Sequence, residues 1–281
     1  MQTNFKSILK HTCAASILSV LLFSCRKNDP PRDNPQNLET GASLVGASSI
    51  SQSLYDDVFS QINVEAENNN VAGRLATENG TLGCATVTLS PADLNTFPKI
   101  MTIDYGSGCN IGNISRKGKL TVNLSGRLRY AGTAVLVSFD NYFVNDHKLE
   151  GSFTISNNMA GNSLSFTTQT INGRVTFPAR LVYYTYSGSH TYTQVGGENT
   201  ATFTDDSWSI IGSSITTAAS NESLALTVET PLVKNVACGS IVSGVQTFTY
   251  NNLSGSLNYG TGNCDREALL TIGGFNTIIN F

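Results

Sequence analysis

The side chains that could support nucleophilic catalysis are few, and their spacing does not form a catalytic set. Such catalysis needs a base beside the nucleophile, and beyond residue 24 the only histidines are His147 and His190. His147, in an Asn-Asp-His-Lys segment, is interpreted as a solvated turn residue, and His190 gives no stronger signal. No serine occurs in a G-x-S-x-G motif. The sequence therefore predicts no catalytic residue and no enzymatic activity.

Acidic residues occur as two adjacent pairs and as a group beside glycine turns. Asp56-Asp57 and Asp205-Asp206 could serve glycoside hydrolysis only if the fold brought separate carboxyl groups close together, so they are interpreted as an exposed helix face and a hairpin tip. Asp104, Asp265 and Glu267 are candidate calcium ligands, but no EF-hand spacing is present. We predict no metal site and no cofactor.

Aromatic side chains cluster in one part of the sequence. Tyr184, Tyr186 and Tyr192 lie close together, and Trp208 follows. Exposed rings form platforms for sugars or apolar ligands, so these four residues are candidate ligand contacts. The alternative is that they pack across neighbouring strands of a half-buried sheet.

Cys25 lies at the end of a short apolar run. Lys6 and Lys10 precede an uncharged stretch from Thr12 to Phe23, which is too short to span a bilayer and has the length of a signal-peptide core. Leu22-Phe23-Ser24-Cys25 resembles the lipobox of bacterial lipoproteins. The resemblance implies cleavage before Cys25, transfer of diacylglycerol to its sulfur and acylation of its freed amine. The alternatives are an uncleaved membrane helix and an ordinary secretory signal.

Two or three acyl chains hold a protein at a membrane, whereas one chain binds reversibly. The predicted organisation is a signal peptide over residues 1–24, a lipidated N-terminus and tether over 25–47, and a β-rich domain with an N-terminal helix over 48–281. Arg26 follows the cysteine in place of the aspartate that retains enteric lipoproteins at the inner membrane, which favours the outer membrane. The sequence leaves open whether the body faces the periplasm or the cell surface.

Four further cysteines, Cys84, Cys109, Cys238 and Cys264, follow the predicted anchor. An even number in an oxidising envelope indicates disulfides. We predict two local pairs of nearly equal separation, Cys84 with Cys109 and Cys238 with Cys264, each constraining the unfolded chain by roughly 3–4 kcal/mol. No C-x-x-C spacing supports zinc as the alternative.

The charge of the chain argues against a nucleic-acid partner. Without residues 1–24 the 17 basic residues fall to 15, against 20 acidic ones. Only 13% of all residues are charged and no basic run occurs, whereas a duplex binder needs clustered lysine and arginine.

One helix and many strands are expected. Apolar residues recur every four positions from about Ser48 to Val64, which predicts an amphipathic helix with Asp56, Asp57 and Glu65 on its polar face. Packing on a sheet is favoured over docking to a partner or to a membrane.

From Cys84 onward apolar and polar residues alternate with period two, as in Lys119 to Tyr130, and Asn-Gly, Ser-Gly and Gly-Gly pairs separate the segments. The pattern predicts an all-β domain, an antiparallel meander of about a dozen strands. Short connections exclude parallel α/β architecture. A barrel, a sandwich and a long curved sheet remain as alternatives.

One turn occurs twice, as Asp104-Tyr-Gly-Ser-Gly-Cys109 and Asn258-Tyr-Gly-Thr-Gly-Asn-Cys264. Together with the four segments given at the end of this paragraph, these turns resemble the recurring marks of a family of Bacteroidota lipoproteins that has no assigned function. The family usually has Asp where this chain has Asn258, so a calcium site at the second turn would be weakened. The four segments are Arg116 to Leu120, Phe139 to Asn145, Asn172 to Val175 and Thr230 to Leu232.

The leading interpretation is a non-enzymatic envelope lipoprotein whose β domain binds or scaffolds a glycan, a protein or another macromolecule. The alternative is a carrier that holds a lipid or another hydrophobic ligand, and a glycan-acting hydrolase is the third. A carrier predicts a contiguous apolar groove under the helix, and a scaffold predicts a filled core with exposed rings.

Metabolic labelling with palmitate is expected to mark the wild-type protein and to leave the Cys25→Ala variant unmarked, because that residue is the predicted acylation site. The matched control is Cys13→Ala, which changes a cysteine inside the predicted signal peptide and should be labelled like wild type. An unlabelled wild-type protein would contradict the lipoprotein assignment.

Overall fold

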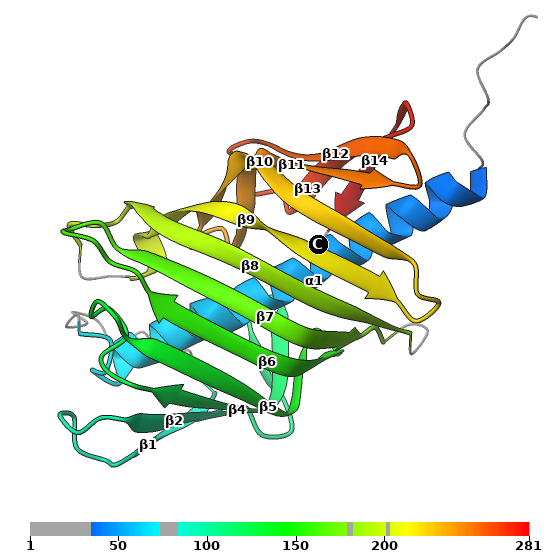
Figure 1. The fold of residues 1–281 in the computed structure, drawn as a ribbon. Helices are drawn as coiled ribbons and strands as arrows, with labels where there is room; N and C mark the ends of the chain where they lie inside the picture. Colours follow the sequence, from blue (N-terminus) through cyan, green and yellow to red (C-terminus); the bar gives the residue numbers. More distant parts are fainter. Residues whose placement is uncertain (1–34, 74–83, 179–181, 201–202, 281) are drawn as a thin grey trace, which may run out of the picture. The chain divides into compact units, whose positions relative to one another are not determined.

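The computed structural model describes residues 35–73, 84–178, 182–200 and 203–280. Over these residues the chain forms one long helix, one short 3-10 helix and fourteen strands joined in a single antiparallel sheet. The predicted all-β meander is confirmed. The sequence left a barrel, a sandwich and a long curved sheet as alternatives. The structure has the curved sheet, which is not closed and has β1 and β14 as its edges (Figure 1).

Strand order follows the sequence, except that β2 pairs with β4 while β3 pairs with β4 beside it. The predicted signal peptide, the predicted acylation site Cys25 and the first part of the predicted tether lie outside the described residues. The elements are α1 (Pro35–Asn68), β1 (Thr86–Ser90), β2 (Lys99–Asp104), β3 (Cys109–Ile111), β4 (Ile114–Leu124), β5 (Ala134–Val144), β6 (His147–Asn157), β7 (Ser165–Thr176), β8 (Tyr183–Gly196), η1 (Phe203–Asp205), β9 (Ser207–Ala218), β10 (Ser223–Asn235), β11 (Ser240–Tyr250), β12 (Leu253–Thr261), β13 (Glu267–Ile272) and β14 (Phe275–Asn280).

Helix α1 begins at Pro35, so residues 35–47 are helical and do not belong to the predicted tether. The proline and asparagine content of this stretch suggested a linker. A proline at the first position of a helix is tolerated, because the N–H that it lacks would have no partner inside the helix. The helical part of the domain therefore starts well before Ser48.

Helix α1 runs obliquely across one face of the sheet (Figure 1) and is buried on nearly every side between Leu44 and Glu67. The expected wet, acidic face is wrong, since Gln52, Asp56 and Glu65 are buried together with the apolar residues. Periodicity reports which side chains are apolar, but it cannot show that a curved sheet supplies partners for the polar ones.

Aromatic rings fill the contact between helix and sheet. Tyr55 stacks on Tyr186 of β8, with ring centroids 5.6 Å apart. Phe59 packs against Tyr192 of β8 at 4.7 Å and Trp208 of β9 at 5.9 Å. The expectation that the helix packs on the sheet is therefore confirmed, and this interface is its core.

The predicted strand from Lys119 to Tyr130 ends early, at Leu124. The residues that follow turn toward the end of α1, where Leu128 donates its N–H to Val71 O (3.2 Å) and Arg129 donates to Ala72 O (2.8 Å). Leu128 is buried by this contact. Past the strand only Leu128 keeps facing the core, whereas Tyr130, the last residue of the predicted strand, is exposed.

The strands bend sharply around the helix through β-bulges, where the pairing register shifts. Shifts lie between Lys117 and Lys119 in β4 and between Thr170 and Gly173 in β7, and further shifts occur in β5, β6, β10 and β11. Each of the four segments that carry the family resemblance contains or overlaps one of these shifts. Their common physical role is to bend the sheet.

Gly118 shows why a bulge restricts the residue type. Its φ is +82°, and a Cβ there would lie 2.0 Å from the main-chain oxygen of Asn141 on β5. Gly112 in the β3–β4 turn also has a positive φ, +58°, but a Cβ there would meet nothing within 4 Å.

Replacement of Gly118 by alanine is expected to lower the free energy of unfolding by about 3–5 kcal/mol, because left-handed strain and overpacking add together. Gly112→Ala carries the backbone strain alone and should cost about 1–2 kcal/mol. Urea denaturation of both variants measures the difference, and equal losses would show that the bulge does not confine this position.

Candidate functional site

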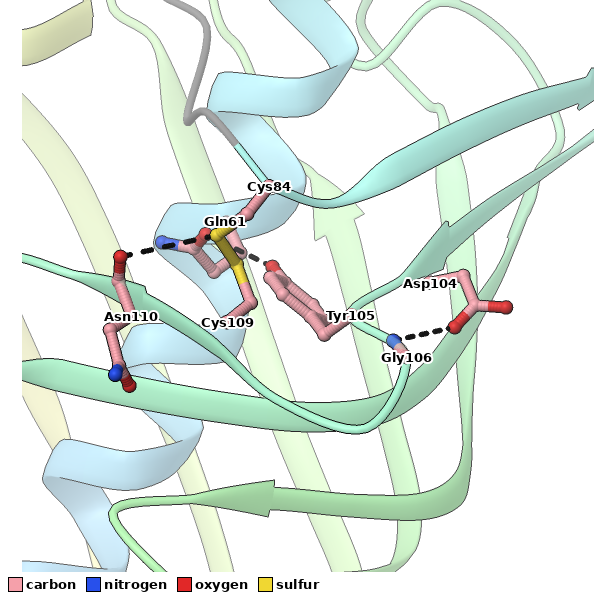
Figure 2. The surroundings of a disulfide bond; sticks show 7 residues. All are labelled: Gln61, Cys84, Asp104, Tyr105, Gly106, Cys109 and Asn110. Atoms are coloured by element: carbon pink, nitrogen blue, oxygen red, sulfur yellow. Dashed lines mark hydrogen bonds between the residues drawn. A yellow bond between two sulfur atoms is a disulfide. The ribbon is translucent and has the colours of Figure 1, made fainter.

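Both predicted disulfides are formed, Cys84 with Cys109 and Cys238 with Cys264. The first connects the segment before β1 to the turn after β2 (Figure 2). The second connects the β10–β11 turn to the β12–β13 loop. The local pairing that the cysteine spacing predicted is thus confirmed.

The two glycine turns use the same local hydrogen bond. Asp104 Oδ1 accepts the N–H of Gly106 (2.9 Å), as Figure 2 shows, and Asn258 Oδ1 accepts the N–H of Gly260 (2.9 Å). Asp and Asn can both provide this acceptor. Asn258, in place of the aspartate of the first turn, therefore leaves the turn itself unchanged.

The tyrosine of each turn reaches toward helix α1. Tyr105 donates its hydroxyl hydrogen to Gln61 Oε1 (3.0 Å; Figure 2). Tyr259 donates to Gln246 Oε1 (2.8 Å), and Gln246 Nε2 donates to Gln52 Oε1 (3.0 Å). Burial raises the pKa of both tyrosines well above the usual value, so the hydroxyls stay protonated donors. The repeated turns thus contact the helix at two separate points.

The candidate calcium ligands make other contacts. Asp104 pairs with Lys119 (3.3 Å), and Asp265 Oδ1 accepts the N–H of Glu267 (3.1 Å). Over the described ranges, no group of three or more His, Cys, Asp or Glu is placed to hold a metal ion. The glycine turns are therefore accounted for by hydrogen bonds within the chain.

The predicted aromatic ligand platform is wrong for three of its four residues. Tyr186, Tyr192 and Trp208 are each about 1% exposed and belong to the core. They occupy inward positions of β8 and β9, opposite the helix. Tyr184 is half-buried, and its ring packs edge-on against Phe177 at 5.3 Å. The alternative, packing inside the sheet, is what the structure shows.

Two of the acidic residues interpreted as surface groups form buried ion pairs. Asp57 of α1 accepts two hydrogen bonds from Arg116, at 2.8 Å from Nε and 2.5 Å from Nη2. Asp206 is fully buried and pairs with Arg129 (2.9 Å), which also contacts Glu67 of the helix (3.1 Å). The prediction that Asp206 lies exposed at a hairpin tip was wrong. Its partner Arg129 is distant in sequence, so no local pattern indicated the ion pair.

A cavity of about 370 Å³ lies beside the helix, and we call it the α1 pocket. Ile50 and Leu54 line it from α1. Ile114 of β4 and Val144 of β5 add apolar surface from one part of the sheet, and Arg266 lines it from the β12–β13 loop. Because these residues come from strands far apart in the sheet order, no local pattern in the sequence could predict the pocket.

Asp57 and His147 both line the α1 pocket. Both carboxylate oxygens of Asp57 are bound by Arg116, while His147 Nδ1 donates to the main-chain oxygen of Asn145 (2.9 Å). Among the hydrogen bonds of the described residues, none joins His147 to Asp57 or to a serine. The histidine and the acid therefore share the cavity without forming a proton relay.

A second cavity, of about 10 Å³, shares Ser53, Gly239 and Ser240 with the α1 pocket. Lys234 and Asp56 also line it. Nζ of the buried Lys234 donates to the main-chain oxygen of Asp56 (3.1 Å). The Ser240 hydroxyl is buried and has no hydrogen-bond partner in the described part of the chain. Polar groups thus lie where the small cavity shares residues with the α1 pocket.

No protein-family model, curated protein or solved structure matches this chain. Within the described residues, no helix is both long and apolar enough to cross a membrane.

His190 lies in the core beside the helix, 4% exposed. Burial lowers its pKa below the usual value, and the negative charge of Asp56 opposes this effect in part. Asp56 is itself buried and accepts a hydrogen bond from Tyr192. The folded protein therefore keeps His190 neutral over a range of pH in which the unfolded chain protonates it.

Stability should fall as the pH drops below about 6.5, the unfolded pKa of histidine, down to the lower folded pKa of His190, because the unfolded state then binds one more proton. One proton contributes at most about 1.4 kcal/mol per pH unit. In urea titrations from pH 7 to pH 5, His190→Gln should reduce this dependence, with His147→Gln as the matched control. An unchanged slope in His190→Gln would rule out His190 as its source.

Proposed function

We propose that this chain is a non-enzymatic binding protein of the bacterial envelope, held at the outer membrane through acylated Cys25, and that its β domain binds a small, partly apolar ligand in the α1 pocket. The α1 pocket is the observation that carries the proposal. Its volume of about 370 Å³ lies in the range of small-molecule sites, which are mostly apolar with a few polar groups.

The packing between helix and sheet favours binding in the α1 pocket over the two alternatives from the sequence, a carrier with a groove under the helix and a scaffold with exposed rings. A carrier with a long groove under the helix would need space that Tyr55, Phe59 and Trp208 fill. A scaffold that binds glycans through exposed rings would need Tyr186, Tyr192 and Trp208 at the surface, where they do not lie. The α1 pocket is beside the helix, in a place that neither scheme anticipated.

The contacts in the pocket support binding rather than catalysis. A general base must be oriented toward the group whose proton it takes. His147 is oriented by a main-chain oxygen, and Asp57 is neutralised by Arg116. These two residues therefore shape the wall of the pocket.

Filling the pocket should weaken binding. N-phenyl-1-naphthylamine, a neutral apolar dye, should bind the tagless domain saturably at one site and gain fluorescence. Ile50→Trp places a large ring on the pocket wall. It should weaken binding of the dye by at least about tenfold, or 1.4 kcal/mol.

The matched control is Ile211→Trp, the same change at a half-exposed position of β9 away from the pocket. It should bind the dye like wild type. Urea midpoints of both variants verify folding. No saturable binding by wild type, or equal binding by Ile50→Trp, would refute the proposal.

A further inference from the structure

We propose that the ligand of the α1 pocket is an anionic amphiphile, a single apolar chain with an acidic head, and that Arg266 binds the head. The inference rests on the proposed function and adds the chemical class of the ligand. It follows from the charges around the pocket, from the lack of a described partner for the Arg266 guanidinium, and from the polar groups where the two cavities share residues.

Among the described residues that line the two cavities and their ion-pair partners, the charges leave one positive charge over. Asp57 is the carboxylate that lines the α1 pocket, and it is paired with Arg116. At the small neighbouring cavity, Lys234 lies beside Asp56, so their charges offset each other. Within the described part of the chain, Arg266 therefore gives the pocket its net positive charge.

Arg266 differs in its contacts from the other arginines among the described residues. Arg116 and Arg129 form buried ion pairs, Arg127 donates to the main-chain oxygens of Asn70 and Leu94, and Arg174 stacks on a tyrosine ring. The Arg266 guanidinium makes no hydrogen bond or ion pair with any described residue. A guanidinium presents a planar fork of donors that fits a carboxylate or a phosphate.

The backbone places this guanidinium at the pocket. Arg266 has a φ of +57°, a conformation that costs a non-glycine residue about 1 kcal/mol or more. A Cβ added to Gly239 would lie 3.6 Å from Arg266 Nη2, so the guanidinium lies over Gly239, which lines both cavities. The strained loop therefore holds Arg266 where the two cavities adjoin.

Further donors lie at the same place. Ser240 has a buried hydroxyl with no partner among the described residues, and it lines both cavities. Lys234 is 5% exposed, and its Nζ donates one hydrogen bond in the described structure, although an ammonium has three donors. Buried donors without acceptors cost free energy, and the small cavity has room for about one water-sized group. An acidic oxygen placed there would satisfy both side chains.

The remaining wall fits the apolar chain of such a ligand. Ile50, Leu54, Ile114 and Val144 line the α1 pocket but not the small cavity that holds Lys234. A ligand with an apolar body and one acidic end therefore matches the two kinds of surface that the cavities present.

Competition against N-phenyl-1-naphthylamine at pH 8 tests the inference with three probes of equal chain length, each below its micellar concentration: dodecanoate, dodecyl phosphate and neutral dodecanol. At least one anion should displace the dye from wild type with an inhibition constant about tenfold or more below that of dodecanol. The tighter anion identifies the head as carboxylate or phosphate.

Arg266→Gln should lose the preference for the anion, so that the anion binds no more tightly than dodecanol. Arg174→Gln, a matched change of a surface arginine outside the pocket, should retain the preference. Ser240→Ala is the second variant, to be used if Arg266→Gln fails to fold. It should weaken binding of the anion more than binding of dodecanol.

Equal binding of anions and alcohol by wild type, or an unchanged preference in Arg266→Gln, would overturn the inference while dye binding still supported the proposed function. Failure of the dye itself to bind wild type would instead refute the proposed function. The two failures are therefore distinguishable.

Discussion

Burial of helix α1 on nearly every side is the constraint on which the rest of the structure depends. A buried polar group is costly unless it is hydrogen-bonded, and a buried charge must be paired. The helix carries Gln52, Asp57, Gln61 and Glu67, and a side-chain oxygen of each accepts a hydrogen bond from the surrounding structure. The sheet must therefore curve around the helix and present specific polar residues to it. The bulges provide the curvature, and the two disulfide-linked turns provide two of the contacts.

The α1 pocket follows from the same arrangement, because the sheet is not closed around the helix. On one side the pocket is lined by residues of β4 to β6, and on the other by the β10–β11 turn, the β12–β13 loop and the end of β14. These two parts of the sheet are far apart in strand order. Where they leave the helix uncovered, Ile50 and Leu54 form a wall of a cavity. A closed barrel of the same strands would have no such opening.

Much of the fold could be predicted from the sequence because the signals were local. Alternation marked the strands, and the nearly equal cysteine spacings marked both disulfides. The start of α1 could not be predicted, since Pro35 is compatible with a linker and with the first residue of a helix. The inward direction of Tyr186 and Tyr192 was missed because alternation separates two faces without showing which one meets the helix. Arg266 and Ser240 carried no signal, because the site depends on contacts between segments distant in sequence.

Polar contacts also decide where along the sheet the helix lies. Ile50, Leu54, Val58 and Ile62 repeat every four residues, so a shift of the helix by about one turn, or 5.4 Å, would replace each apolar residue with another of similar size. Hydrophobic burial alone distinguishes such positions weakly. The polar residues Gln52, Asp57, Gln61 and Glu67 are unevenly spaced, so the same shift would leave several of them buried without partners. Breaking a buried ion pair costs about 3–5 kcal/mol, so the Asp57–Arg116 contact alone strongly disfavours the shifted helix. The polar contacts therefore keep Ile50 and Leu54 at the α1 pocket, and the binding site depends on the same interactions that specify the fold.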